Sequence, residues 1–244
     1  GAENTAVGKG ALNANTTAAN NTAVGRSALL VNTTGTENVS LGSLSSDAGT
    51  IASYNVAVGH DALTTNVASD KNTAIGHSAL AALSASSQAD GFNVAVGYVA
   101  GAAITTGAAN VLVGVGAGDA ITTANNNTAV GHLSLSANTT GTRNSALAAY
   151  ALDANTTGNY NSSVGSYSLT ANTTGSYNTA LGDYALGANT TGGNNVAVGN
   201  QALDANTTAD NNTAVGVSAL GANTATGGTA VGYGALAANV SKNY

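Results

Sequence analysis

The sequence predicts an all-β fold: a parallel β-solenoid (β-roll) of about fourteen coils, each of about 17 residues. Three observations support this prediction: a repeated motif, a column of β-branched residues, and turn residues at fixed positions. The phrase Asn-Thr-Ala-Val-Gly begins at Asn4 and returns, intact or lightly changed, at intervals of about 17 residues almost to the C-terminus. A fixed period of this length indicates one structural unit per copy.

We number the positions of each copy from slot 1, its first Asn, to slot 17. The copies begin at Asn4, Asn21, Asn38, Asn55, Asn72, Asn93, Asn110, Asn127, Asn144, Asn161, Asn178, Asn195, Asn212 and Gly228. The interval from Asn72 to Asn93 is longer than the others and holds four extra residues within 83–90. We expect a small bulge or loop there that leaves the register intact.

The slots differ in chemistry, and each indicates a structural role. Slot 4 is aliphatic in every copy and mostly β-branched, which predicts a buried strand. Slot 5 is Gly in thirteen copies and Ala148 in the other, so its backbone needs the freedom of Gly or lies too close to another group for a side chain. Slot 9 is Leu in eleven copies and predicts a second core column, with exceptions at Ser46, Gly101 and Gly118. Slots 12 to 15 commonly read Asn-Thr-Thr-Gly, a set of turn residues.

The length of the repeat indicates that each copy forms one coil of the solenoid. At about 3.3 Å per residue, one repeat makes a circuit of roughly 56 Å, which leaves room for two strands of about five residues in two facing sheets. We therefore expect strands at slots 2 to 5 and 8 to 11, each pairing with the same slots of the next coil. An α-solenoid is excluded because so short a repeat cannot hold two packed helices with their turns.

Composition narrows the possible partners. Only 7% of the residues are charged, the net charge is −6, and the five cations are scattered, so nucleic acid is not an expected partner. The chain has no Cys, which excludes disulfides and thiolate metal sites. No apolar run approaches the length of a membrane span, so we expect no membrane insertion by this segment. We expect one solenoid domain over 1–244 and, because the chain has no Met and no signal sequence, a segment of a longer protein.

Small residues predict a surface for self-association. If slots 2 and 4 face the core, strand alternation points slot 3 outward, yet slot 3 is Ala or Ser in thirteen copies, with Leu112 the exception. A small, uncharged outward column suggests close contact with another chain, although a plain Ala face in solvent is the alternative. The predicted oligomer interface comprises Ala6, Ala23, Ala57, Ala74, Ala95, Ala129, Ala180, Ala197 and Ala214.

The strand phrases also carry a resemblance. Asn-Val-Ala-Val-Gly at Asn55, Asn93 and Asn195, with Asn-Thr-Ala-Ile-Gly at Asn72, resembles the head repeat of YadA-like trimeric autotransporter adhesins. The full unit from Asn178 also resembles the shaft repeats of bacterial and phage tail fibres. The resemblance covers nearly the whole chain and implies a β-roll in a three-chain bundle, exposure on a cell or virion surface, and adhesion.

Candidate sites for chemistry are few. The run Gly114-Val-Gly-Ala-Gly-Asp119 superficially matches a glycine-rich binding loop, but it lacks the helix and acidic partner of a dinucleotide site, so a coil variant is the preferred interpretation. His60, His77 and His132 all occupy slot 6. Exposed stacking is preferred over a metal site, for which Asp61 is the nearby third ligand. No nucleophile has a base at recognisable spacing, and we expect no enzyme activity, cofactor or metal.

Tyrosines form the better candidate for ligand binding. Tyr150, Tyr167 and Tyr184 share slot 7 of three successive coils, and Tyr160 and Tyr177 share slot 17 between them. We expect short ladders, which either present a platform for carbohydrate or stabilise neighbouring coils, and the second interpretation is preferred.

The sequence thus predicts an extracellular structural segment, a stiff spacer in a homotrimer that binds a cell-surface glycan or protein receptor. The alternative is a filament subunit that polymerises end to end through its open coils. Ice binding through Thr columns is weaker, because slots 13 and 14 are adjacent turn positions. The Asn-Thr-Thr corners match glycosylation sequons in form, but we interpret them as turn chemistry; they begin at Asn15, Asn32, Asn138, Asn155, Asn172, Asn189 and Asn206.

Overall fold

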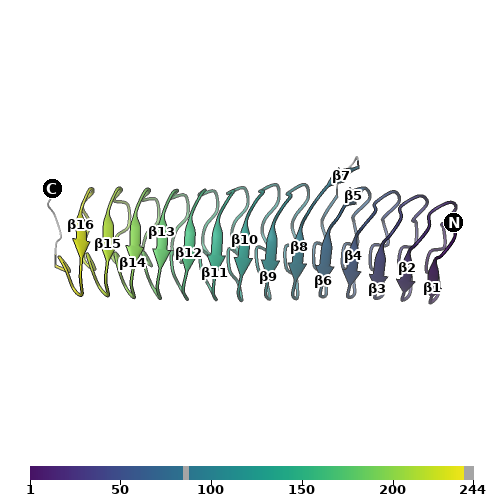
Figure 1. The fold of residues 1–244 in the computed structure, drawn as a ribbon, viewed down its shortest axis with the longest axis horizontal. Coiled ribbons are helices and arrows are strands. Elements are labelled where there is room, and N and C mark those ends of the chain that lie inside the picture. The colour runs from purple at the N-terminus through teal and green to yellow at the C-terminus, as the bar shows by residue number, and fades with distance from the viewer. Residues whose placement is uncertain (85–87, 239–244) are drawn as a thin grey trace. The chain divides into compact units, whose positions relative to one another are not determined.

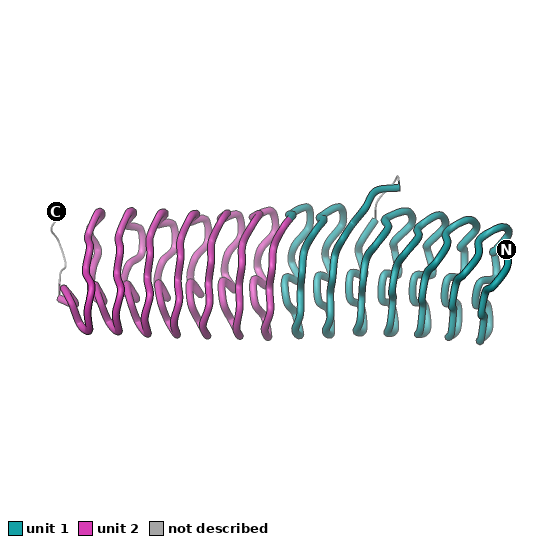
Figure 2. Tube along the Cα trace, in the orientation of Figure 1, with its two compact units in different colours: residues 1–125 teal, residues 126–244 magenta. Residues whose placement is uncertain are grey.

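The computed structural model describes residues 1–84 and 88–238. The predicted fold class is confirmed: these residues form a parallel β-solenoid and, within them, no helix occurs. The chain divides into two compact units, Gly1–Asn125 (unit 1) and Asn126–Tyr244 (unit 2), which Figure 2 colours separately. The single domain expected over 1–244 stays a prediction.

In unit 1 each repeat supplies one short strand to a parallel sheet, in the order β1-β2-β3-β4-β6-β8-β9 (Figure 1). A second, two-stranded parallel sheet consists of β5 and β7. The strands are β1 (Thr5–Val7), β2 (Thr22–Val24), β3 (Val39–Leu41), β4 (Val56–Val58), β5 (Ser69–Asp70), β6 (Thr73–Ile75), β7 (Ala89–Asp90), β8 (Val94–Val96) and β9 (Val111–Val113).

Unit 2 repeats this plan with strands paired in chain order from β10 to β16 (Figure 1). They are β10 (Thr128–Val130), β11 (Ser145–Leu147), β12 (Ser162–Val164), β13 (Thr179–Leu181), β14 (Val196–Val198), β15 (Thr213–Val215) and β16 (Thr229–Val231). Each covers slots 2 to 4. Identical slots pair, as when Ala180 lies opposite Ala197, so the sequence period sets the sheet register.

The expected orientation of the strands is wrong, because slot 3 faces the interior and slots 2 and 4 face outward. Ala57 and Ala129 are fully buried, whereas Leu41 and Leu181 are 37% and 48% exposed. Slot 3 packs against slots 8 and 9: Ala23 shares a core cluster with Ala28 and Leu29. Because slots 8 and 9 already fill the narrow coil with Ala and Leu, the facing strand position has room for only a small side chain.

This reversal corrects the predicted oligomer interface. All but the first of its nine residues lie inside their own coils, at most 1% exposed, and are not available to another chain. They are Ala23, Ala57, Ala74, Ala95, Ala129, Ala180, Ala197 and Ala214. Ala6, in the first coil, is exposed.

The second strand expected at slots 8 to 11 is also absent from the described coils, where slots 6 to 11 form turns. Slots 7 and 9 adopt left-handed backbone conformations, as at Ser27 (φ 58°) and Leu29 (φ 49°). A strand points successive side chains to opposite faces, but slots 8 and 9 are both buried. The left-handed turn places both inside, while the backbone still bonds to neighbouring coils, as from Leu29 N–H to the Ser45 carbonyl (3.1 Å).

Two columns of buried Asn side chains link the coils. At slot 1 the Asn161 Oδ1 accepts bonds from the backbone N–H (3.0 Å) and Nδ2 (3.2 Å) of Asn178. At slot 12 the Nδ2 of Asn172 donates to Asn155 Oδ1 (2.8 Å) and to the Gly175 carbonyl (3.0 Å). The corner Asn residues are therefore core ladders, and in the folded chain the buried sequon amides are closed to modification.

Slot 5 needs Gly for both of the reasons expected. Gly182 has φ 137°, and a Cβ there would lie 2.6 Å from the carbonyl group of Gly199 in the next coil. Ala148 adopts φ 132° at the same slot and is therefore strained.

The four extra residues of the fifth repeat leave the register intact, as expected, because Ala74 of β6 still pairs with Ala95 of β8. The expected bulge at 83–90 lies in part outside the described residues, which omit 85–87. On its flanks Leu83 is buried in the coil, and β7 pairs with β5.

Candidate functional site

The outward strand side chains form a surface that recurs from coil to coil in each unit. We call the slot 2 and slot 4 side chains the outer strand face. Slot 2 is Thr, Val or Ser and slot 4 is Val, Leu or Ile, so the face carries no charged residue. Within the sheets Ile75, Leu147 and Leu181 are 39%, 39% and 48% exposed. A repeated, uncharged and largely aliphatic column in solvent is typical of an interaction surface.

Sequence reasoning missed this face because it assigned the aliphatic column to the core. One signal in the sequence could have corrected it. Leu112 replaces the usual Ala of slot 3 where Gly101 and Gly118 replace the usual Leu of slot 9. An exchange of bulk between two slots indicates that they face each other, which places slot 3 inside.

The predicted tyrosine ladders are confirmed as ring stacks. Tyr150 and Tyr167 lie 5.0 Å apart between ring centroids with planes 5° apart, and Tyr167 and Tyr184 lie 5.1 Å apart at 11°. Tyr160 and Tyr177 stack at 4.9 Å. Both faces of the Tyr167 ring are thus occupied by other tyrosines. Because a sugar would stack on a ring face, this geometry favours the structural interpretation of the ladder.

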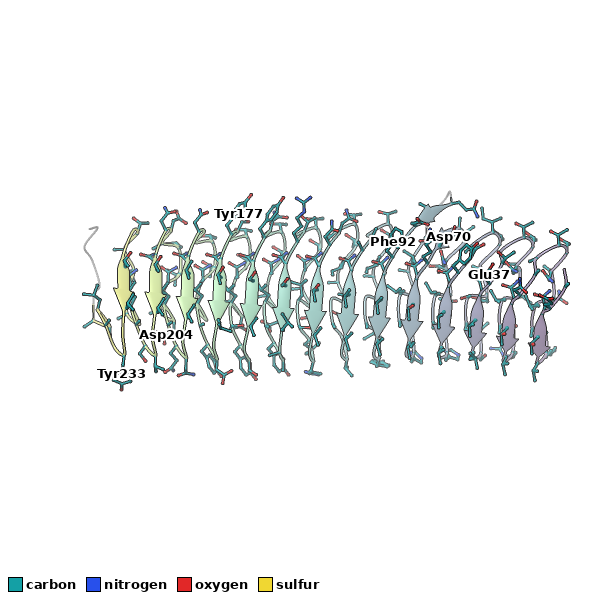
Figure 3. All side chains as sticks on the ribbon, viewed as in Figure 1. Glu37, Asp70, Phe92, Tyr177, Asp204 and Tyr233 are labelled. Atoms are coloured by element: carbon teal, nitrogen blue, oxygen red, sulfur yellow. The ribbon has the colours of Figure 1, made fainter. Side chains whose placement is uncertain are left out.

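The five tyrosines do not form one surface. Figure 3 places Tyr177 (slot 17) and Tyr233 (slot 6) at opposite edges of unit 2. The slot 7 ladder belongs to the slot 6 edge, because His132 packs edge-on against Tyr150 at 5.3 Å. The slot 17 ladder ends on Arg143, whose guanidinium carbon lies 5.2 Å from the centroid of the Tyr160 ring. Ligand binding by these tyrosines stays a prediction for two separate ladders.

The histidines of unit 1 form the exposed stack that the sequence predicted. The rings of His60 and His77 lie 5.3 Å apart with planes 13° apart, and Tyr98 extends the column at 5.4 Å from His77.

The glycine-rich run Gly114–Asp119 is a coil variant, as expected. Gly114 is the ordinary slot 5 Gly with φ 142°, and the following residues form the turn of their coil. Burial raises the pKa of the Asp119 carboxyl above its ordinary value, against the opposing effect of its backbone hydrogen bonds.

Charged groups gather beside the insertion. Lys71 Nζ lies 2.8 Å from Asp90 Oδ2 and 5.3 Å from the centroid of the Phe92 ring. Burial raises the pKa of the neighbouring Asp70, although its Oδ1 accepts a bond from Ser53 N–H (2.7 Å). Figure 3 shows Asp70 and Phe92 at the same edge of unit 1. The pair Lys71–Asp90 joins the inserted strand to the preceding coil, which is a structural role.

A shallow surface depression lies on the first two coils, lined by Lys9, Gly10, Asn13, Arg26, Ser27 and Leu30. Its two cations are the slot 6 residues of adjacent coils. Both are surface side chains, and the depression is too open to define a ligand.

Comparison with known proteins identifies no relative. No family model matches the chain, and neither a curated protein nor a solved structure matches it. Among the described residues, no helix is long and apolar enough to span a membrane.

Proposed function

We propose that this chain is a structural segment of a surface fibre or adhesin, assembled as a homotrimer through the outer strand face. The observation that supports the proposal is the uncharged aliphatic column, regularly spaced and exposed along the sheet of each unit. A position that faces only solvent does not need an aliphatic residue in every repeat, whereas a position that contacts a partner surface does.

The occupant of this face is a second copy of the same chain. Each copy carries the same column at the same spacing of about 4.8 Å, so two copies in register place like residues opposite one another along the whole contact. A partner with another period would lose register after a few coils. The number of three chains follows from the resemblance of the strand phrases to YadA-like head repeats.

The interior supports a role as a stiff spacer. Each coil is tied to the next by backbone bonds around its circumference, and the buried Asn columns add side-chain bonds, such as Asn189 Nδ2 to Asn172 Oδ1 (2.9 Å). Buried hydrogen bonds of this kind are costly to break, so bending or opening a coil is unfavourable. The outer strand face would then be covered, and the edges of the coils would present side chains to a receptor.

The mechanism is mechanical and multivalent. Three chains would present each edge three times, so that weak contacts with a surface glycan or protein add through avidity. Such a fibre acts outside the cell or on a virion. The end-to-end filament stays an alternative prediction, which no contact in the described coils favours over the lateral assembly.

The test of the trimer compares two double variants in unit 2. Leu147→Lys with Leu181→Lys places charge on the outer strand face, and Thr140→Lys with Thr174→Lys places the same charge at the same two-coil spacing on exposed corner positions. Burying unpaired charges in an interface is costly, so the first pair should lower the mass measured by light scattering from three chains to one. The second pair should leave it at three.

A wild-type mass of one chain would reject the proposal, as would equal behaviour of the two double variants. Electron microscopy of the wild type separates the alternatives, because lateral assembly widens the particle whereas end-to-end assembly lengthens it.

A further inference from the structure

Three potential metal ligands meet on the slot 6 edge of unit 1. His60 and Asp61 are consecutive, and His77 occupies slot 6 of the next coil. The His60 Nδ1 lies 2.9 Å from Asp61 Oδ2. One ligand atom from each of the three residues lies within 4.8 Å of the other two. The sequence analysis preferred stacking to a metal site at these histidines, and the structure adds the contact of the Asp61 carboxylate with the His60 ring.

We propose that His60, Asp61 and His77 form a surface site for a divalent transition-metal ion of the zinc class. Zinc binds nitrogen at about 2.0–2.1 Å and carboxylate oxygen at about 2.0–2.2 Å, so two tetrahedral ligand atoms lie roughly 3.3 Å apart. The His60–Asp61 pair is already near that separation. The ligand atom of His77 lies within 4.8 Å of the other two, and binding requires that this exposed imidazole rotate out of its stack on His60. Water completes the fourth position.

The backbone holds the three residues in place without the ion. Ser78 N–H bonds to the His60 carbonyl (3.0 Å), and Asp61 N–H bonds to the Ser43 carbonyl (3.2 Å). Asp61 has a left-handed backbone conformation (φ 57°), as slot 7 does in the other coils. The repeat thus brings the two histidines together, and a single slot 7 Asp supplies the charge.

Second contacts orient the His77 ring. Ser78 Oγ lies 2.9 Å from His77 Nδ1, which leaves Nε2 of this ring to bind the ion, and without the ion the ring lies between His60 and Tyr98. Such outer contacts fix the orientation of ligand histidines.

The ligand set indicates which ion is bound. Two imidazoles and one carboxylate suit zinc, copper or nickel, whereas magnesium and calcium require mainly oxygen ligands. We expect Zn²⁺ to bind with one ion per chain, and Mg²⁺ to produce no binding signal at the same concentration.

Unit 2 supplies a matched control. His132 occupies slot 6 there, but slot 7 of its coil is Leu133 and slot 6 of the next coil is Ala149. Its ring packs against Tyr150. A histidine in the same slot without Asp and a second His should contribute nothing.

The experiment is isothermal titration calorimetry of the untagged chain with ZnCl₂ in a buffer that does not chelate. His77→Asn and Asp61→Asn should each weaken binding at least tenfold, and His132→Asn should leave it unchanged. Circular dichroism checks that each variant is folded. The visible spectrum of Co²⁺ bound to the wild type provides a second measurement that needs no variant, since tetrahedral nitrogen and oxygen ligation gives intense bands. The absence of Zn²⁺ binding by the wild type would overturn the proposal, and so would equal losses in His77→Asn and His132→Asn.

Discussion

Two regions fill the same coil interior in different ways. In unit 2, slot 9 is Leu and slot 12 is Asn in successive coils, from Leu135 and Asn138 to Leu220 and Asn223. In unit 1 the coils that begin at Asn93 and Asn110 carry Gly101 with Ile104, and Gly118 with Ile121, at these slots. The first region therefore has a polar ladder beside a leucine column at these two slots, whereas the second has Gly and Ile there and keeps only the buried Asn ladder of slot 1.

In these coils of unit 1, a larger side chain at slot 3 compensates for the missing Leu side chains at slot 9. A Cβ on Gly101 would lie 2.7 Å from Leu112 Cδ1, and one on Gly118 would lie 2.8 Å from Leu112 Cδ2. Leu112, in slot 3, thus occupies space that slot 9 leaves empty, and it is fully buried together with Ile104 and Ile121. The comparison shows that the coil conserves interior volume while the slot that supplies it varies.

The largest effect should come from removing the compensating side chain. Leu112→Ala leaves a cavity between two glycines that cannot fill it, and should lower the free energy of unfolding by about 2–5 kcal/mol. Chemical denaturation measures the loss. Adding Gly101→Leu and Gly118→Leu together with Ile104→Asn and Ile121→Asn restores the slot 9 and slot 12 pattern of unit 2 and should recover part of it. No recovery would mean that slots 3 and 9 do not exchange volume.

Placing the Ile of unit 1 at slot 12 of a unit 2 coil, where slot 9 is still Leu, should destabilise that coil. Asn172→Ile removes the bond to Asn155 Oδ1 and places an apolar branch beside Leu169, where unit 1 has Gly. The unpaired amide oxygen should cost about 1–3 kcal/mol, with overpacking added. Hydrogen exchange should show faster exchange in the adjacent coils. Unchanged protection would contradict the view that Ile at slot 12 needs Gly at slot 9.

On the surface of unit 2, two tyrosines of the slot 7 stack differ in the number of rings that they contact. Tyr167→Ala breaks two stacks at once and should cost about 1–3 kcal/mol, at roughly 0.5–1.5 kcal/mol for each pair. Tyr184→Ala breaks the single stack described for that ring and should cost about half as much. Thermal melting compares the two variants. Equal, negligible losses, together with glycan binding that both variants abolish on an array, would favour a binding role over a structural one.

The smallest effect concerns the one non-glycine at slot 5. Ala148→Gly should stabilise unit 2 by about 1 kcal/mol, because relief of a strain of roughly 1–3 kcal/mol exceeds the added entropy of the unfolded chain. Gly182→Ala, at the same slot, should destabilise it. The melting temperatures of the two variants should move in opposite directions, and a lower value for Ala148→Gly would show that its backbone is not strained.

Much of the fold and part of the surface could be predicted from the sequence. The period, the pairing of identical slots, the Gly at slot 5 and the tyrosine ladders follow from repetition, because each coil places its residues above the same residues of the last. For the proposed metal site, the sequence brings together His60, Asp61 and His77, but the left-handed backbone of Asp61 and its contact with His60 are not predicted by the strand pattern. The five tyrosines looked like one cluster in the sequence, but slots 7 and 17 lie at different edges.

The order of the amino acids is enough to specify a parallel β-solenoid with a coil of about 17 residues, because a strict repeat leaves one coil plan and one register. Packing in three dimensions selects which face of the strand is inside. Alternation allows either Ala at slot 3 or Val at slot 4 to be buried, and local preference favours the larger side chain. The left-handed turn at slots 7 and 9 directs Ala and Leu inward together, and the space that remains admits only a small residue. The aliphatic column is thereby left on the surface of each unit.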